Sequence, residues 1–202
     1  MNAECNAVVP DPAPDANVLE RVDVAIAQEA GELRKNPAVR VLGALSELAD
    51  QPPLIAFSAG TLALGLLTRH PRLAVTGARM LSSHLLATGI KAVIKKSVDR
   101  TRPHILVEEN RYEVGRGAHN EHDYNSFPSG HTAGAVAVAQ AVARDYPASA
   151  TSARLLATGV ALVQIPRCKH YVSDIGVGAL IGWVSERVAS RLLDAALARF
   201  AR

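Results

Sequence analysis

The chain has 202 residues, of which 49% are hydrophobic and 20% charged. Its mean hydropathy is +0.10, so the length suits one domain and the balance lies on the apolar side of an ordinary soluble domain. The formal net charge is +3. Aromatic side chains that could stack on bases are almost absent near the densest basic group, residues 91–103, which argues against nucleic-acid binding. Cys5 and Cys168 lie far apart and predict neither a disulfide framework nor a zinc site.

The N-terminal quarter divides into two segments. Residues 1–16 are rich in Pro, Asp, Asn and Ala and predict a disordered leader without the features of a secretory signal. In residues 17–50, apolar positions recur at helical spacing and are interrupted at Asn36-Pro37. This pattern predicts a pair of amphipathic helices.

Residues 51–202 form the third segment, a helical domain. Ala and Leu carry much of its apolar content, and both favour helix. Residues 104–126 are polar and without periodicity, which predicts a long loop of the kind that often carries function. The expected fold class is therefore all-α: an amphipathic helix pair followed by a transmembrane bundle of about five core helices. These five are expected over Pro53–Thr68, Leu73–Ile94, His131–Ala143, Ala153–Val163 and Ile175–Leu197.

The membrane placement depends on length and charge. The first core helix would span about 24 Å, slightly less than a hydrocarbon core of about 30 Å. Arg79 in the second would cost about 2.5–3.5 kcal/mol at a helix centre. If each helix crosses once, one side receives Arg69, His70, Arg72, residues 144–154, Arg199 and Arg202. Positive charge marks the cytoplasmic side. We expect a multi-pass protein of a bacterial inner membrane whose motifs face the periplasm or exterior, with a soluble bundle as the alternative.

A first polar cluster follows the second core helix. Lys95 and Arg102 are seven residues apart, close to two helical turns, so both cations are expected on one helix face. Pro103 is expected to end that helix. Taken alone, the pair fits an ordinary basic helix end, which is favourable at the negative pole of the dipole.

A second cluster, residues 127–132, stands directly before a helix rich in Ala and Val. Ser129 suits the N-cap position, and the amides of Gly130 and His131 could hold an anion at the positive end of the helix. The His131 side chain could donate a proton beside it. An ordinary helix cap with an exposed histidine is the simpler interpretation.

A third cluster spans residues 167–174. His170 and Asp174 are four residues apart, and a carboxylate that accepts a proton from one ring nitrogen leaves the other free to attack phosphorus. A helix-stabilising pair, worth a few tenths of a kcal/mol, is again the simpler interpretation. All three clusters fall at helix ends, so together they favour one shared pocket.

The three motifs together resemble those of the type 2 phosphatidic acid phosphatase superfamily, which includes bacterial acid phosphatases and vanadium haloperoxidases. The family's first motif, a Lys followed after six residues by Arg-Pro, matches Lys95, Arg102 and Pro103. Its second motif, Pro-Ser-Gly-His, matches residues 128–131. Its third motif, a His followed after three residues by an Asp, matches His170 and Asp174. The resemblance covers roughly residues 50–195. The family places an Arg six residues before the nucleophilic His, where this chain has Gln164, and Arg167 is the nearby candidate for the missing cation.

The resemblance implies a metal-independent phosphatase with a phosphohistidine intermediate and no cofactor. His170 would attack phosphorus, Asp174 would fix its tautomer, and His131 would protonate the leaving group and later activate water. The implied substrate is a lipid phosphate or an isoprenoid diphosphate at a membrane, and a homo-oligomer is left open. The residues implied to bind phosphate are Lys95, Arg102, Ser129, Gly130 and Arg167.

Two alternative functions remain open at this point. A vanadate-dependent haloperoxidase would use the same pocket to bind vanadate through its histidine. A catalytically impaired membrane protein that binds lipid phosphate would explain Gln164 in place of the family Arg.

Overall fold

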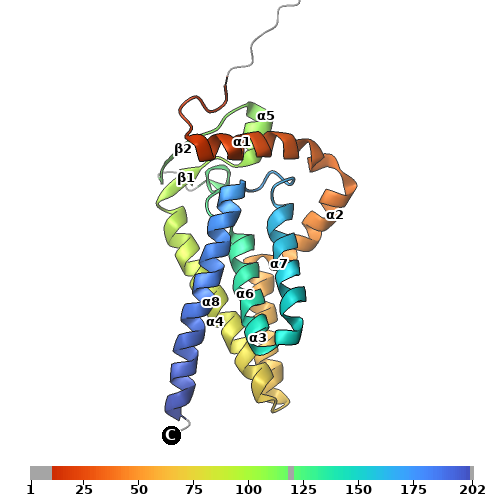
Figure 1. Ribbon diagram of the computed structural model, residues 1–202, viewed down its shortest axis with the longest axis vertical. Coiled ribbons are helices and arrows are strands. Elements are labelled where there is room, and N and C mark those ends of the chain that lie inside the picture. Colours follow the sequence, from red (N-terminus) through yellow and green to blue (C-terminus); the bar gives the residue numbers. More distant parts are fainter. Residues whose placement is uncertain (1–10, 118–120, 201–202) are drawn as a thin grey trace, which may run out of the picture.

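The structure, a computed structural model, describes residues 11–117 and 121–200. Within them the α-helices are Val18–Gly31 (α1), Pro37–Ser46 (α2), Gln51–Leu67 (α3), Pro71–Lys95 (α4), Pro103–Glu109 (α5), Gly130–Asp145 (α6), Ala150–Val163 (α7) and Val172–Phe200 (α8). Strands Val98–Arg100 (β1) and Val114–Arg116 (β2) pair antiparallel. Short 3₁₀ turns are Glu32–Lys35 (η1), Glu47–Ala49 (η2), His122–Tyr124 (η3) and Pro147–Ser149 (η4). Figure 1 shows α3, α4, α6, α7 and α8 along the long axis, with α1 lying across one end of this bundle.

The N-terminal helix pair is confirmed. At the start of α1, Asn17 Oδ1 accepts from the Glu20 amide at 3.0 Å and a Glu20 carboxylate oxygen accepts from the Asn17 amide at 2.9 Å, which is a capping box. Asn36 caps α2, and Pro37 occupies its first turn, where a missing N–H costs nothing. Residues 1–10 of the expected leader lie outside the described residues, whereas Ala13 is buried against α1 and α5.

Small residues let the central helix α6 pack closely against α8. Ala133, Ala137 and Ala141 of α6 are at most 1% exposed. On α8, a Cβ at Gly182 would lie 2.4 Å from the Ala133 carbonyl oxygen, so a larger residue there would force the two helices apart. The backbone also joins the two helix starts, since the Ser129 amide donates to the Asp174 carbonyl at 3.1 Å. The second and third motifs are thereby held side by side.

The first motif is arranged differently from the expectation. Helix α4 ends at Lys95, the chain continues into β1, and Pro103 begins α5 instead of ending a helix. Proline is favoured at this position because its φ suits the helix and its missing N–H would have had no partner. The prediction that Lys95 and Arg102 share one helix face was therefore wrong.

The expected fold class also needs correction. The described residues are mostly helical, but the segment expected as a loop over 104–126 contains α5, η3 and strand β2, which pairs with β1. The count of about five core helices missed α5, and "all-α" missed the small sheet. In the described part of the chain, no helix is both long enough and apolar enough to cross a membrane.

Candidate active site

A cavity of about 250 Å³ opens where α3 and α6 begin and α4 ends, next to the turn between α7 and α8. Side chains that the sequence places in three separate motifs meet there. Six predicted site residues line it: Lys95, Arg102, Gly130, His131, Arg167 and His170. Five residues were not anticipated: Glu47, Asp50, Lys91, His122 and Lys169.

His170 is fixed in one orientation by a backbone carbonyl. Its Nδ1 lies 2.8 Å from the Ser126 carbonyl oxygen and 3.7 Å from Asp174 Oδ2. Because a carbonyl can only accept, Nδ1 carries the proton and Nε2 keeps its lone pair. Burial lowers the pKa of His170 to about 4, so the ring is neutral near pH 7. The direct partner of Nδ1 is thus Ser126, and not Asp174 as the spacing had suggested.

Asp174 organises the surroundings of His170. Its carboxylate accepts from Ser126 Oγ at 2.6 Å and from the Tyr171 amide at 2.8 Å. Arg100 Nη1 donates to Asp174 Oδ1 at 2.7 Å. Burial by itself raises the pKa of this carboxyl, but the neighbouring His170 ring and the Arg100 charge lower it to about 2. Asp174 is therefore ionised, and it holds in place the residue whose carbonyl orients His170.

Arg100 was not predicted as a site residue. It is 4% exposed, and its Nη2 donates to Asp23 Oδ2 at 2.8 Å and to the Tyr112 hydroxyl at 2.9 Å. Its guanidinium also lies 4.1 Å from the centre of the Tyr171 ring. One sequence signal could have revealed this network, because Asp23 lies on the same helix face as the buried Ala27 and Gly31, where an unpaired charge would be costly.

Backbone carbonyls of η3, of the residue after it and of the turn between α7 and α8 fix the two cations of the first motif. Lys95 Nζ donates to the Asn125 carbonyl, Arg102 Nε donates to the His122 carbonyl at 2.8 Å, and Arg102 Nη1 donates to the Lys169 carbonyl at 3.2 Å. Burial, helped by the charge of Arg102, lowers the pKa of Lys95 to about 7. An anion in the cavity would restore the charged form of Lys95.

The start of α6 is shaped by Ser129 and Gly130. Ser129 is fully buried, and its Oγ caps the helix by accepting from the Thr132 amide at 3.4 Å and the Thr132 hydroxyl at 3.0 Å. The expected N-cap is confirmed, but the Ser129 hydroxyl faces the helix and does not line the cavity. Gly130 does line it, and a Cβ there would lie 3.2 Å from Lys91 Nζ.

Gln164, which replaces the family Arg, lies behind the cavity. It is fully buried, and its Nε2 donates to the Val160 carbonyl at 2.9 Å and to Ser46 Oγ at 3.2 Å. Arg167 Nη1 reaches the same Ser46 Oγ at 2.7 Å and lies 3.4 Å from Gln164 Oε1. Helix α7 ends at Val163, so Arg167 lies in the turn that follows and not on a continuation of that helix. It therefore lines the cavity despite its shifted position.

The sequence model of the PAP2 superfamily matches residues 76–197, which is more than half of the chain. The chain belongs to the PAP2 superfamily.

Two solved structures agree with this family. The crystal structure of Aquifex aeolicus LpxE has a TM-score of 0.59 and 20% identity, with 88% of this chain and 97% of that one covered. A transmembrane PAP2 type phosphatidylglycerolphosphate phosphatase from Bacillus subtilis has a TM-score of 0.61 and 19% identity, with 91% of this chain and 90% of that one covered. At such identities the matches show a shared fold. Among curated proteins, no match was found.

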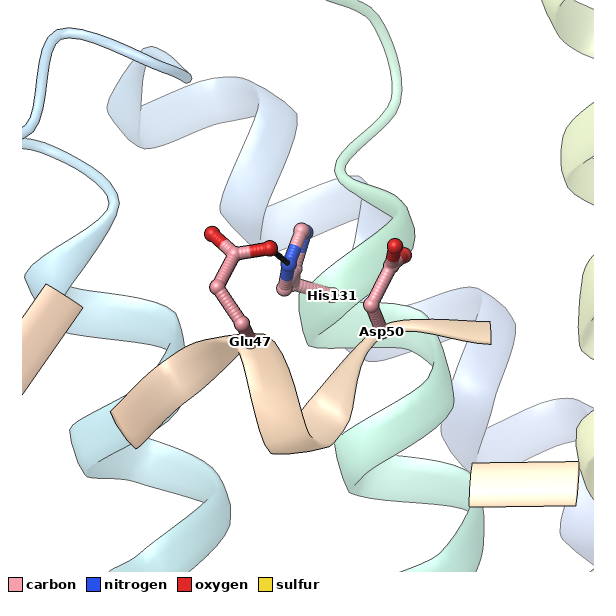
Figure 2. A group of neighbouring side chains, drawn as sticks. All are labelled: Glu47, Asp50 and His131. Atoms are coloured by element: carbon pink, nitrogen blue, oxygen red, sulfur yellow. Dashed lines mark ion pairs between the residues drawn. The ribbon is translucent and has the colours of Figure 1, made fainter. Parts of the chain in front are cut away.

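This member of the PAP2 superfamily also brings residues into the cavity from outside the matched segment. Glu47 and Asp50 stand at the two ends of one short turn beside His131, and Glu47 Oε2 lies 3.6 Å from His131 Nε2 (Figure 2). One possible ligand atom from each of the three lies within 4.8 Å of the others. A histidine nitrogen and two carboxylates are a donor set that suits a divalent cation. The same cavity, however, is lined by five positively charged side chains: Lys91, Lys95, Arg102, Arg167 and Lys169.

Proposed function

We propose that the protein is a phosphatase that removes a phosphate from a lipid or isoprenoid phosphomonoester or diphosphate through a phosphohistidine at His170. One observation carries the proposal. The Ser126 carbonyl holds the proton on His170 Nδ1, so Nε2 is unprotonated in a cavity that also holds His131 and cationic side chains. A neutral imidazole with a fixed tautomer is a suitable nucleophile toward phosphorus.

In the proposed reaction, His170 Nε2 forms a bond to phosphorus while the bond from phosphorus to the leaving oxygen breaks. His131 gives its proton to that oxygen, so the alcohol or phosphate leaves with its charge neutralised. His131, now neutral, takes a proton from a water molecule, whose oxygen attacks phosphorus and releases His170. Lys95, Arg102 and Arg167 would stabilise the charge on the other phosphoryl oxygens. This sequence of steps uses no metal ion.

The outer surface of the bundle supports a membrane location. Buried positions inside the bundle include several polar side chains, whereas large apolar ones face outward. This distribution suits a lipid environment, because a bundle in water would instead hide apolar side chains and expose polar ones. The outward side chains include Phe57, Leu64, Leu67, Leu155, Leu156, Leu180, Trp183 and Leu192, and the buried polar ones include Ser58, Ser83, Ser185 and Ser190. We propose a multi-pass protein of a bacterial inner membrane, with the cavity on the face away from Arg69 and Arg72.

The structural match to a phosphatidylglycerolphosphate phosphatase supports a lipid phosphate as the substrate class. A vanadate-dependent haloperoxidase is not favoured, since that match is described as a phosphatase. The hypothesis of a catalytically impaired binding protein is also less favoured. Gln164 accepts a hydrogen bond from Arg167, and Arg167 supplies a cation to the cavity.

The test is phosphate release from a panel of lipid and isoprenoid phosphates in detergent with EDTA present. We expect the wild type to release phosphate, His170→Ala to release none, and the exposed control His70→Ala to behave as the wild type. Radioactive phosphate should also remain on denatured wild type and be lost on acid treatment, as expected for a bond to a histidine nitrogen. No release from any substrate would favour a binding protein, and activity lost in EDTA would contradict the metal-free mechanism.

A further inference from the structure

Two carboxylates from the N-terminal arm, residues 17–50, flank His131 at the rim of the cavity. Figure 2 shows Glu47 and Asp50 on the same short turn, with the His131 ring between them. His131 Nε2 is buried, has no hydrogen-bond partner among the described residues, and faces Glu47 Oε2 at 3.6 Å. The family match begins at residue 76, so neither carboxylate belongs to the matched segment.

The charges around His131 make these carboxylates necessary. Burial lowers the pKa of His131, and the charge of Arg167 lowers it further, so both disfavour a protonated imidazole. A general acid must nevertheless hold a proton when the substrate arrives. Glu47 and Asp50 are the acidic side chains that line the cavity, and their negative charges favour the imidazolium.

The Asp50 side chain does not cap the helix that it precedes, and its negative charge acts on both His131 and Lys91. Asp50 occupies the N-cap of α3, yet its carboxylate makes no capping hydrogen bond to that helix in the part of the chain described. Glu47 is shared, since its other carboxylate oxygen forms an ion pair with Arg167. The two acids therefore differ, because Glu47 forms an ion pair with a cation proposed to bind phosphate, whereas Asp50 acts on His131 and Lys91 through its charge alone.

We infer that Glu47 and Asp50 are positioning residues that stabilise the His131 imidazolium, Glu47 by facing its Nε2 proton and Asp50 by its nearby negative charge, so that the Nδ1 proton is delivered to the leaving oxygen. This inference rests on the proposed function, in which His131 is the general acid. After delivery His131 keeps the Nε2 proton and has an unprotonated Nδ1, which is the tautomer needed to accept a proton from water. The N-terminal arm would thus complete the acid side of the site.

The test compares two substrates that differ in their need for a proton. Dodecyl phosphate has an alkoxide leaving group that must be protonated, whereas p-nitrophenyl phosphate leaves readily without one. Each variant is compared with the wild type on each substrate in detergent. We expect Asp50→Asn to lower kcat/KM for dodecyl phosphate by about 10-fold or more, a part of the roughly 100-fold or greater contribution of a general acid. We expect the kcat/KM for p-nitrophenyl phosphate to change by less than about 2-fold, because this constant covers only the steps up to release of the leaving group, which here needs no acid.

Three further variants make the result interpretable. His131→Ala should show the same selective loss of kcat/KM at full size, and Glu29→Gln, which replaces an exposed acid of α1, should show none. Glu47→Gln should add a rise in KM on both substrates, because Arg167 loses its partner.

Equal losses on both substrates for Asp50→Asn, or no loss at all, would overturn the inference. A selective loss in His131→Ala would still support His131 as the general acid. Activity that requires a divalent cation and is lost with Asp50→Asn would overturn it in favour of a metal site at these three residues. A wild type that hydrolyses neither substrate would instead remove the proposed function itself.

Discussion

Asp23 Oδ2 lies 2.8 Å from Arg100 Nη2, and this ion pair is buried, with side-chain exposures of 1% and 5%. The other terminal nitrogen of Arg100 donates to Asp174 beside the proposed nucleophile. Asp23 also accepts from the Ser173 amide at 3.0 Å. The first N-terminal helix is therefore tied through one arginine to the carboxylate that organises His170.

Replacing Asp23 should damage both the fold and the site. Removing one partner of a buried ion pair leaves an uncompensated charge, which typically costs about 3–5 kcal/mol. We expect Asp23→Ala to lower the free energy of unfolding by an amount of this order, measured by denaturant titration in detergent. Asp23→Asn, which keeps an acceptor oxygen, should lower the free energy of unfolding by less. It should lower kcat with little change in KM, because Arg100, the partner of Asp174, would be held less firmly. The exposed Asp15→Asn is the control, and an Asp23→Asn variant as stable and active as that control would contradict the argument.

The fold was largely predictable because local signals agree with the final packing. The interruption at Asn36-Pro37 predicted a helix boundary that the structure contains, and the run rich in Ala and Val after residue 131 predicted a helix that corresponds to α6. The short strands β1 and β2 were missed because three-residue pairings carry no periodic signal. The spacing of Lys95 and Arg102 suggested a continuous helix, since sequence distance alone does not show where a chain leaves the helix.

The candidate site was predictable in part. The motifs identified six residues that line the cavity, because their chemical types and helix-end positions could be read from the chain. Their catalytic roles remain proposals. The contributions of Glu47 and Asp50 were not predictable, because both come from a segment far away in sequence and act only through tertiary contact. The helix-face position of Asp23 indicates a buried charge, but it does not identify Arg100 as the partner. The Ser126 carbonyl was missed for a different reason, since a backbone acceptor leaves no trace in side-chain patterns.

The low pKa of Lys95 predicts an alkaline limit to activity. Burial, followed by the charge of Arg102, lowers this pKa to about 7, so the lysine is charged below that pH and neutral above it in the free enzyme. Because kcat/KM reports the free enzyme, it should fall as pH rises through about 7. With p-nitrophenyl phosphate, whose leaving group needs no proton from His131, Lys95→Arg should lose this fall because a guanidinium stays protonated, and its rate should be lower than that of the wild type.

The measurement is kcat/KM for p-nitrophenyl phosphate from pH 5 to 9 for the wild type and Lys95→Arg, with the exposed Lys35→Arg as control. The control should keep the alkaline fall of the wild type. An unchanged alkaline fall in Lys95→Arg would assign the titration to another group and contradict the prediction.

Arg167 should supply the phosphate-binding cation that the family places at the position of Gln164. It lines the cavity, and its Nη1 donates to Ser46 Oγ at 2.7 Å, so its guanidinium is already held in place. A hydrogen bond to a charged group contributes about 1.5–3 kcal/mol, which corresponds to about 10-fold to 150-fold in affinity. We expect Arg167→Gln to weaken inhibition by inorganic vanadate by a factor in this range.

A double variant separates the loss of charge from damage to the turn. The side chains of residues 164 and 167 both reach Ser46, so an arginine at 164 could approach the cavity from the family position. Arg167→Gln combined with Gln164→Arg should recover part of the vanadate affinity, whereas Arg167→Gln with Gln140→Arg, a cation added away from the cavity, should recover none. If Arg167→Gln binds vanadate as tightly as the wild type, the remaining cations of the cavity suffice and Arg167 is only a partner for Glu47.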